Sequence, residues 1–180
     1  MTDLMNIIKG RRSIREYHEK EIPDGFLDQI LESVKWSPSW ANTQCWEVIV
    51  IKDQEMKKGI QEIMPKTNPA RKHFAEAPVV LALCGKFNSS GFYKGEASTK
   101  LGDWLMFDLG IATHSICLTA HDLGLGTVIV GVFDHNKARE ILGVPDEFEL
   151  VSLIPLGYPA HDSKAPKRRE VREFTHYEKF

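Results

Sequence analysis

The segment that most constrains the fold runs from about Thr99 to Leu123, where apolar residues are spread nearly all round a predicted helix. A helix without a polar face is stable only when neighbouring elements enclose it. Asp103, Asp108 and His114 interrupt its apolar run, so the segment is too polar to be a transmembrane span. The rest of the chain must therefore supply elements that cover this helix on several sides.

Shorter elements flank that helix in the sequence. Helical patterns start near Asp24, near Gln54 and after Asp134, and residues 1–9 pattern as a short amphipathic helix rather than a signal peptide. Apolar runs rich in β-branched residues predict strands at 48–51, 79–83, 127–133 and 149–156, and residues 86–98 read as a loop. The 180 residues therefore predict one domain with a substantial core.

The composition excludes several classes of protein. The formal net charge of −2 provides no general attraction to nucleic acid or to an acidic membrane surface. Cys45, Cys84 and Cys117 are an odd number without close pairing, which argues against a disulfide framework. We therefore expect a cytoplasmic protein that binds neither nucleic acid nor a membrane.

Two basic clusters near opposite ends of the chain stand out against this slightly acidic background. Guanidinium forks and hydroxyl groups suit phosphate oxygens, so the two clusters together predict a site for one phosphorylated ligand. Plainer alternatives are a solvated charged turn for the first cluster, and a solvated tail or a nucleic-acid patch for the second. The residues concerned are Arg11, Arg12, Ser13 and Arg15 in the first cluster, and Lys167, Arg168 and Arg169 in the second.

A third segment between a helix and a strand carries Pro38, Ser39, Asn42 and Gln44. Carboxamides both donate and accept hydrogen bonds, so they can match the alternating polar edge of a flavin-like ring. The alternative is local capping of the loop by its own polar side chains. Together with the basic clusters, this segment favours a phosphorylated aromatic cofactor.

Other candidate motifs in the chain are weak. Gly124-Leu125-Gly126 follows a helix and precedes a strand, the reverse of a dinucleotide-binding turn, so it predicts a helix end. His114, Cys117 and His121 share one helix face without further ligands, which favours core packing over a metal site. Asp103 and Asp108 are five residues apart and poorly placed as a catalytic carboxylate pair on one face. We expect no metal.

Helical and strand patterns fade after Gly157, yet the remaining tail keeps Val171, Phe174, Tyr177 and Phe180. Long segments without regular structure usually have a function in a compact protein. We expect residues 158–180 to wrap over another surface, that of a partner subunit, and the alternative is a frayed terminus.

These segments, taken in order, resemble the nitroreductase family of flavin mononucleotide (FMN) enzymes. The first cluster is similar to the amino-terminal phosphate motif of that family, and Pro166 to Arg169 is similar to its carboxyl-terminal phosphate motif. Pro38-Ser39 with Asn42-x-Gln44-x-Trp46 resembles the next motif, and residues 123–131 resemble the segment beside the isoalloxazine ring. The order and spacing over nearly the whole chain make the set specific.

The resemblance implies a three-layer α-β-α fold of the α+β class around a central mixed, mainly antiparallel sheet. It implies a single FMN-binding domain over residues 1–180, in an obligate homodimer with two flavins at the interface and tails exchanged between subunits. The first cluster would hold the FMN phosphate from one side, and Lys167 and Arg169 would hold it from the other. Arg168 is the alternative to either of these two residues. From the partner, Pro38, Ser39 and Asn42 would approach the ring with Gln44 nearby, and the backbone of Val128, Ile129, Val130 and Gly131 would run along it.

Some positions depart from the family pattern. Cys45 stands where many members have proline, and Val130 stands where members acting on nitroaromatics often have glutamate. Asn68 is the candidate for the asparagine that reaches the ring from the middle of the chain. Residues 86–98 form a shorter segment than the excursion over the substrate in larger members.

The predicted function is an FMN-dependent oxidoreductase that passes electrons from NAD(P)H to a small organic acceptor, such as a nitro compound or a quinone, by a ping-pong mechanism. The cofactor would carry the chemistry, so no catalytic side chain is assigned. Two alternatives are a non-catalytic flavin-binding or delivery protein and a small-ligand sensor dimer. The candidates for the substrate wall, with packing as their alternative role, are Phe87, Phe92, Tyr93 and Trp104.

Overall fold

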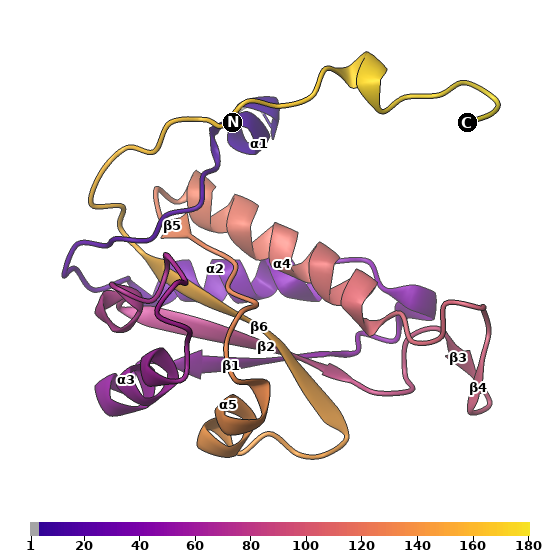
Figure 1. The fold of residues 1–180 in the computed structure, drawn as a ribbon, viewed down its shortest axis with the longest axis horizontal. Coiled ribbons are helices and arrows are strands. Elements are labelled where there is room, and N and C mark those ends of the chain that lie inside the picture. Colours follow the sequence, from indigo (N-terminus) through magenta and orange to yellow (C-terminus); the bar gives the residue numbers. More distant parts are fainter. Residues whose placement is uncertain (1–3) are drawn as a thin grey trace.

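A four-stranded antiparallel sheet forms the centre of the computed structural model, which describes residues 4–180 (Figure 1). Met1 to Asp3, the start of the predicted first helix, lie outside the described residues. The strands β1 (Trp46–Ile51), β2 (Val79–Lys86), β6 (Phe148–Gly157) and β5 (Gly126–Thr127) follow one another across the sheet, each antiparallel to its neighbour. Ser13 adds a parallel bridge to Thr127. The prediction of a mixed, mainly antiparallel sheet is confirmed.

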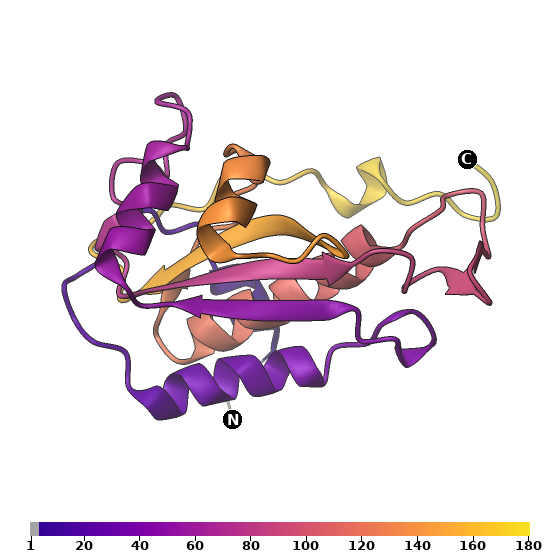
Figure 2. The same ribbon diagram turned by 90° about the horizontal axis from the view of Figure 1, so that it is seen from below.

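Helices cover both faces of this sheet (Figure 2). On one face lie α2 (Asp24–Lys35) and the long α4 (Leu105–Asp122), and on the other lie α3 (Gln54–Glu62) and α5 (His135–Leu142). The short α1 (Leu4–Gly10) contacts α4. Caps fix the boundaries of α5, where the Asp134 carboxylate accepts from the Lys137 N–H and Gly143 adopts the left-handed conformation. The three-layer α-β-α architecture is therefore confirmed.

Each layer buries its own hydrophobic core against the sheet. Leu109 and Ile116 of α4 pack with Leu81 of β2 and with the stripe of α2 on one face. Phe74 and Ile60 occupy the other core, beneath α3 and α5. Full burial of one such side chain contributes about 1.5–3 kcal/mol, so both cores are needed for stability. The prediction that neighbours enclose α4 holds for the sides that face the sheet and α2, whereas Met106, Phe107, Gly110 and His114 leave another face exposed.

Two boundaries differ from the sequence prediction on the α4 side of the molecule. α4 begins at Leu105 rather than at Thr99, because the Asp103 carboxylate accepts hydrogen bonds from the N–H groups of Leu105 (2.9 Å) and Asn88 (2.8 Å) and ends the preceding loop there. The predicted loop at 86–98 contains a small hairpin of β3 (Phe92–Tyr93) and β4 (Glu96–Ala97).

The predicted strand at 127–133 is wrong beyond its first residue. After β5 the chain leaves the sheet, and a single isolated bridge joins Val130 to Leu153. Val128 and Val130 point inward, whereas Ile129 is 54% exposed and Val132 is also exposed. Alternate burial without continuous pairing leaves this backbone at the surface, where it can contact a ligand.

Gly126 brings the segment after α1 close to the sheet. A Cβ atom at this position would lie 2.5 Å from Cγ1 and 2.7 Å from Cβ of Ile14, closer than side chains pack. Ile14 is itself buried, and its N–H donates to the Thr127 carbonyl at 2.9 Å. This close approach fixes the position of the neighbouring arginines.

We predict that Gly126→Ala lowers the free energy of unfolding by about 1–3 kcal/mol, because the added methyl group overpacks against Ile14. Ile14→Ala alone should cost about 2–4 kcal/mol through the cavity that it leaves. The double variant removes the contacts with the Cγ atoms of Ile14 but keeps the one with its Cβ, so its loss of stability should be smaller than the sum of the two single losses. Urea denaturation of all four proteins measures this coupling, and fully additive losses would contradict it.

Candidate functional site

The first basic cluster lies on extended chain that is attached to the sheet on both sides. Ser13 is bridged to Thr127, and four residues later Tyr17 forms an antiparallel bridge with Pro159. The Tyr17 hydroxyl donates to the carbonyl oxygens of Ile14 (2.6 Å) and Pro155 (3.2 Å). These contacts hold residues 11–17 beside the point where the chain leaves β6, so the carboxyl-terminal segment starts next to the amino-terminal arginines.

The structure brings the first basic cluster and one residue of the second to one pocket. This cationic pocket has a volume of about 690 Å³, and its lining includes all four residues of the first cluster together with Arg168 from the second. Lys167 and Arg169 do not line it. The Arg169 guanidinium instead donates to the Glu173 carbonyl and lies 5.7 Å from the centre of the Phe174 ring.

Positive charges outnumber negative ones in the cationic pocket, whose lining also includes Lys164 and the carboxylate of Asp162. Within residues 4–180, none of Arg11, Arg12, Arg15 and Arg168 forms an ion pair with a carboxylate. Arg12 donates through Nη1 to the backbone oxygens of Lys9 and Arg11, and Arg15 donates to that of Ser13, while Nε of Arg12 is buried without a partner. Guanidinium groups gathered in this way favour a bound anion, and a phosphate monoester has the charge and oxygen atoms that they need.

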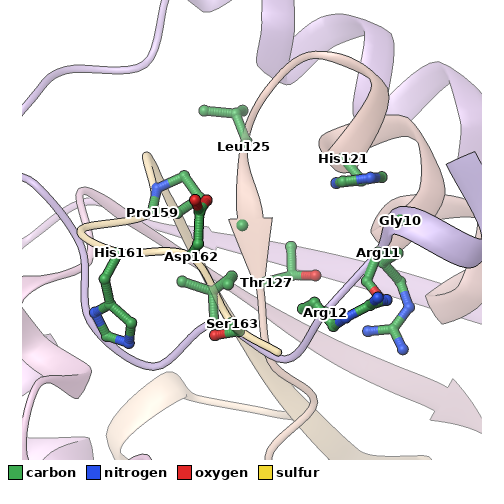
Figure 3. Close-up of a pocket in the computed structure, with 12 residues that line it drawn as sticks. Gly10, Arg11, Arg12, His121, Leu125, Thr127, Pro159, His161, Asp162 and Ser163 are labelled. Atoms are coloured by element: carbon green, nitrogen blue, oxygen red, sulfur yellow. The ribbon is translucent and has the colours of Figure 1, made fainter. Parts of the chain in front are cut away.

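A smaller cavity of about 220 Å³ adjoins these arginines (Figure 3). Arg11 and Arg12 lie on one side of Thr127, and Pro159, His161, Asp162 and Ser163 lie on the other. His121, near the end of α4, also lines it. Burial, and then the positive charges of Arg11 and Arg12, lower the pKa of His121 below its ordinary value of 6.5. Sequence patterns placed His121 only on a helix face with His114 and Cys117 and did not indicate that it faces Arg11 and Arg12. Within residues 4–180 no cluster of metal-ligating side chains occurs.

A second pocket of about 350 Å³, the ring slot, lies next to the cationic pocket because Arg15 lines both. Its walls are residues 67–70 and 128–132, which include all four backbone positions predicted to run along the ring. Asn68 donates through Nδ2 to the Val132 carbonyl at 3.0 Å, so it joins the two walls. The N–H groups of Ile129 and Gly131 make no hydrogen bond within residues 4–180 and remain available to a ligand.

The third predicted segment lies at the other end of α4. The Trp40 N–H bonds to Asp108 in the first turn of α4, whereas His121 in the last turn lines the smaller cavity beside Arg11 and Arg12. Thirteen helical residues separate the two positions by about 20 Å at 1.5 Å per residue. Within one chain, the loop with Pro38, Ser39, Asn42 and Gln44 therefore does not meet the basic clusters.

That loop has an unusual backbone. Ala41, Asn42 and Gln44 have φ angles of 45°, 56° and 47°, in the left-handed region that favours glycine. The Ser39 hydroxyl accepts from the Gln44 N–H at 2.9 Å, and Asn42 Oδ1 accepts from Gln44 Nε2 at 3.2 Å. Such conformations cost about 1–3 kcal/mol each and persist where the surroundings enforce them.

The aromatic residues predicted for a substrate wall lie near this loop, away from the ring slot of the same chain. Trp104 packs against Trp40 (5.0 Å between ring centres) and Phe107 (5.3 Å), and it donates to Thr99 Oγ1 at 2.9 Å. Tyr93 is 70% exposed in the hairpin, whose first strand also carries Phe92, and Phe87 is exposed just before it. In a single chain, these aromatic residues and the loop therefore lie at the opposite end of α4 from the basic clusters.

The Nitroreductase family profile matches residues 8–158, which includes the first cluster, both walls of the ring slot and the strained loop. The chain belongs to the nitroreductase family. It is 32% identical over 189 residues to a protein of Bacillus subtilis named FMN reductase [NAD(P)H], with 99% of this chain and 74% of that protein aligned. The family prediction from the sequence is thus confirmed.

Solved structures of family members agree with this assignment. A nitroreductase family protein of Clostridium novyi NT has a TM-score of 0.79 and 28% identity, covering 88% of this chain and 86% of that chain. A protein of Clostridium difficile R20291, described as an FMN-dependent nitroreductase, has a TM-score of 0.80 and 25% identity. The match covers 98% of this chain and 99% of that chain. Within the described residues, no helix is long and apolar enough to cross a membrane.

We predict that His121 titrates below pH 6.5 in the ligand-free protein. Because its folded-state pKa is lowered, the unfolded chain takes up the proton first, so the stability that His121 contributes is present above about pH 6.5 and is lost as the pH falls. Urea denaturation of the wild type and of His121→Gln should show that the free energy of unfolding of the wild type falls more between about pH 7.5 and 5.5.

Added inorganic phosphate should raise the pKa of His121, since an anion beside Arg11 and Arg12 offsets their charge. Titration of the His121 ring by NMR, with and without phosphate, measures both values directly. A pKa at or above 6.5 without phosphate, or one that phosphate leaves unchanged, would contradict the charge balance described for this pocket.

Proposed function

We propose that this protein is an FMN-dependent oxidoreductase that uses NAD(P)H and acts as a homodimer. One observation carries the proposal: basic residues about 150 positions apart in the chain line a single pocket that opens beside a slot of free backbone N–H groups. The names of the Bacillus subtilis and Clostridium difficile relatives supply the cofactor and, for the first, the electron donor.

The residues of both pockets fit FMN. The phosphate monoester would be held by Arg11, Ser13 and Arg15 from one side and by Arg168 from the other. The isoalloxazine ring would lie along residues 128–131, where the N–H groups of Ile129 and Gly131 can donate to its polar edge. Arg15, which lines both pockets, would mark the passage between phosphate and ring.

A second copy of the chain would complete the site. Leu4 and Ile8 of α1 and Met106 and Phe107 of α4 leave apolar side chains exposed, and an exposed apolar surface of this kind favours association. A two-fold axis beside α4 would bring the strained loop of one copy to the ring slot of the other. The tail at 158–180, which runs away from the domain with Phe174 and Tyr177 exposed, would wrap over the partner (Figure 1).

When bound, FMN would supply the two-electron redox chemistry between NAD(P)H and a small organic acceptor. The protein itself would bind FMN, orient its ring and shield the ring from solvent. Free N–H groups at 129 and 131 would stabilise negative charge on a ring edge placed beside them. Val130, buried in the wall, provides no acid or base, so the proton that completes reduction of the acceptor would come from solvent. Phe92, Tyr93 and the rest of the hairpin would border the acceptor from the partner.

We predict that purified protein binds FMN and that NADH or NADPH bleaches the bound flavin within seconds under anaerobic conditions. Reoxidation by a nitro compound or a quinone would complete the cycle, and parallel initial-rate plots would identify the ping-pong mechanism. Binding without bleaching would favour a flavin-delivery or sensor protein instead, and absence of FMN binding would refute the proposed function.

The phosphate contacts can be tested separately. Charge-assisted hydrogen bonds contribute about 1.5–3 kcal/mol, so Arg15→Gln and Arg168→Gln should each raise the FMN dissociation constant about 10- to 100-fold. Arg172→Gln is the matched control, since this arginine lies in the same tail but outside the cationic pocket. Riboflavin, which lacks the phosphate, should bind all four proteins with similar affinity. Equal losses for Arg172→Gln and Arg168→Gln would contradict the assignment.

A further inference from the structure

Asp108 is a buried acid with a set of partners that the proposed chemistry does not use. It is 1% exposed, in the first turn of α4. The Trp40 N–H reaches both carboxylate oxygens, at 3.2 and 3.1 Å, the Ser90 hydroxyl donates to Oδ2 at 2.6 Å, and the Cys45 thiol lies 3.7 Å from Oδ2. All these groups are donors, so Asp108 serves as the acceptor for three separate residues.

These contacts join three segments that are distant in sequence. Trp40 and Cys45 belong to the strained loop at 37–45, and Ser90 belongs to the segment that leads into the hairpin. Ser90 is fully buried, and its carbonyl accepts from the Trp104 N–H at 3.1 Å. The strained loop and the aromatic segment beside it are therefore tied to α4 through a single side chain.

A second contact fixes the other end of the loop. The hydroxyl groups of Ser37 and Ser115 lie 2.8 Å apart, and Ser115 is seven residues after Asp108, two turns along the same face of α4. The loop is thus attached at both ends to a rigid helix. Ala41, Asn42 and Gln44, with their left-handed backbones, lie between Trp40 and Cys45, the two loop residues that contact Asp108.

Burial of the Asp108 carboxylate costs free energy, because the group loses its hydration. Within residues 4–180 no cation forms an ion pair with Asp108, so only neutral donors offset the loss of its hydration. A buried charge paired in this way is a poor source of stability, because an apolar replacement is often as stable. It is, however, a strict determinant of geometry, since every donor must point at the two oxygens.

We propose that Asp108 is a positioning residue for the shared flavin site, holding the loop at 37–45 in the strained conformation that presents Pro38, Ser39 and Asn42 to the partner's ring slot. This inference rests on the proposed function. Asp108 itself, buried beneath the loop, does not touch the cofactor. Its effect passes through the Trp40 N–H, which fixes the backbone just before Ala41 and Asn42.

Asp108→Asn tests this role, because it keeps the size of the side chain but turns an acceptor into an N–H₂ group that faces other donors. We expect the FMN dissociation constant of the dimer to rise about tenfold or more, through loss of the loop geometry. Lys57→Met is the matched control, since Lys57 is also buried and bonds to a carbonyl, that of Ala77 at 2.7 Å, on the opposite face of the sheet. It should lower stability without changing flavin affinity.

Cys45 reports on the loop independently of flavin. Burial, followed by the negative charge of Asp108, raises the pKa of this thiol to about 12, so it should react slowly with thiol reagents near pH 8. In Asp108→Asn, Cys45 should be labelled at least about tenfold faster, as measured by peptide mapping. Cys84 and Cys117, buried elsewhere, are internal controls. Ser90→Ala removes one donor to Asp108, so it should raise the FMN dissociation constant and the labelling rate of Cys45 by smaller factors. This variant replaces Asp108→Asn in the test if Asp108→Asn fails to fold.

The outcomes separate this inference from the proposed function. If the wild type does not bind FMN, the proposed function and this inference both fall. If the wild type binds FMN, and Asp108→Asn and Ser90→Ala bind it equally well, the positioning role alone is overturned, whether or not Cys45 becomes reactive. Weaker binding together with faster labelling of Cys45, with Lys57→Met unchanged in both, supports it.

Discussion

The convergence of like charges on one pocket is the constraint on which the rest of the account depends. Arg11, Arg12, Arg15 and Arg168 lie around a common space in a protein whose net charge is −2, and none of them has a carboxylate partner among the described residues. Mutual repulsion would disperse such a group unless an anion offset it. The scaffold is built to hold them: the bridges at Ser13 and Tyr17 attach both basic segments to one edge of the sheet.

The length of α4 supports the proposal that two copies share the flavin site. One end of this helix lines the smaller cavity beside Arg11 and Arg12 through His121, and the other holds the strained loop through Asp108. A rigid helix keeps these two regions about 20 Å apart in one chain. A flavin site that needs both must therefore draw one half from each of two copies, which gives a physical reason for the proposed homodimer.

Local sequence patterns predicted those features of the fold that depend only on residues close together in the chain. The stripe of α2 with Leu27, Ile30 and Val34, and the caps of α5, are periodic or short-range signals. The start of α4 was missed because Asp103 reaches Asn88, fifteen residues away. The role of Asp108 was missed for the same reason: its partners at 40, 45 and 90 meet only in the folded chain. The placement of Arg168, rather than Lys167 or Arg169, in the pocket likewise depends on the path of the tail.

Complementation between two impaired variants, at an FMN concentration that saturates intact sites alone, tests the central claim most directly. Arg15→Gln damages the phosphate half-site and Asn42→Ala damages the loop half-site, so each homodimer has two defective sites. After subunit exchange in an equal mixture, a site shared between copies predicts one intact site in each heterodimer, and NAD(P)H-dependent turnover should recover to about a quarter of the wild-type value. If turnover in the mixture stays at the average of the two variants although heterodimers form, each chain contains its whole site and the account is contradicted.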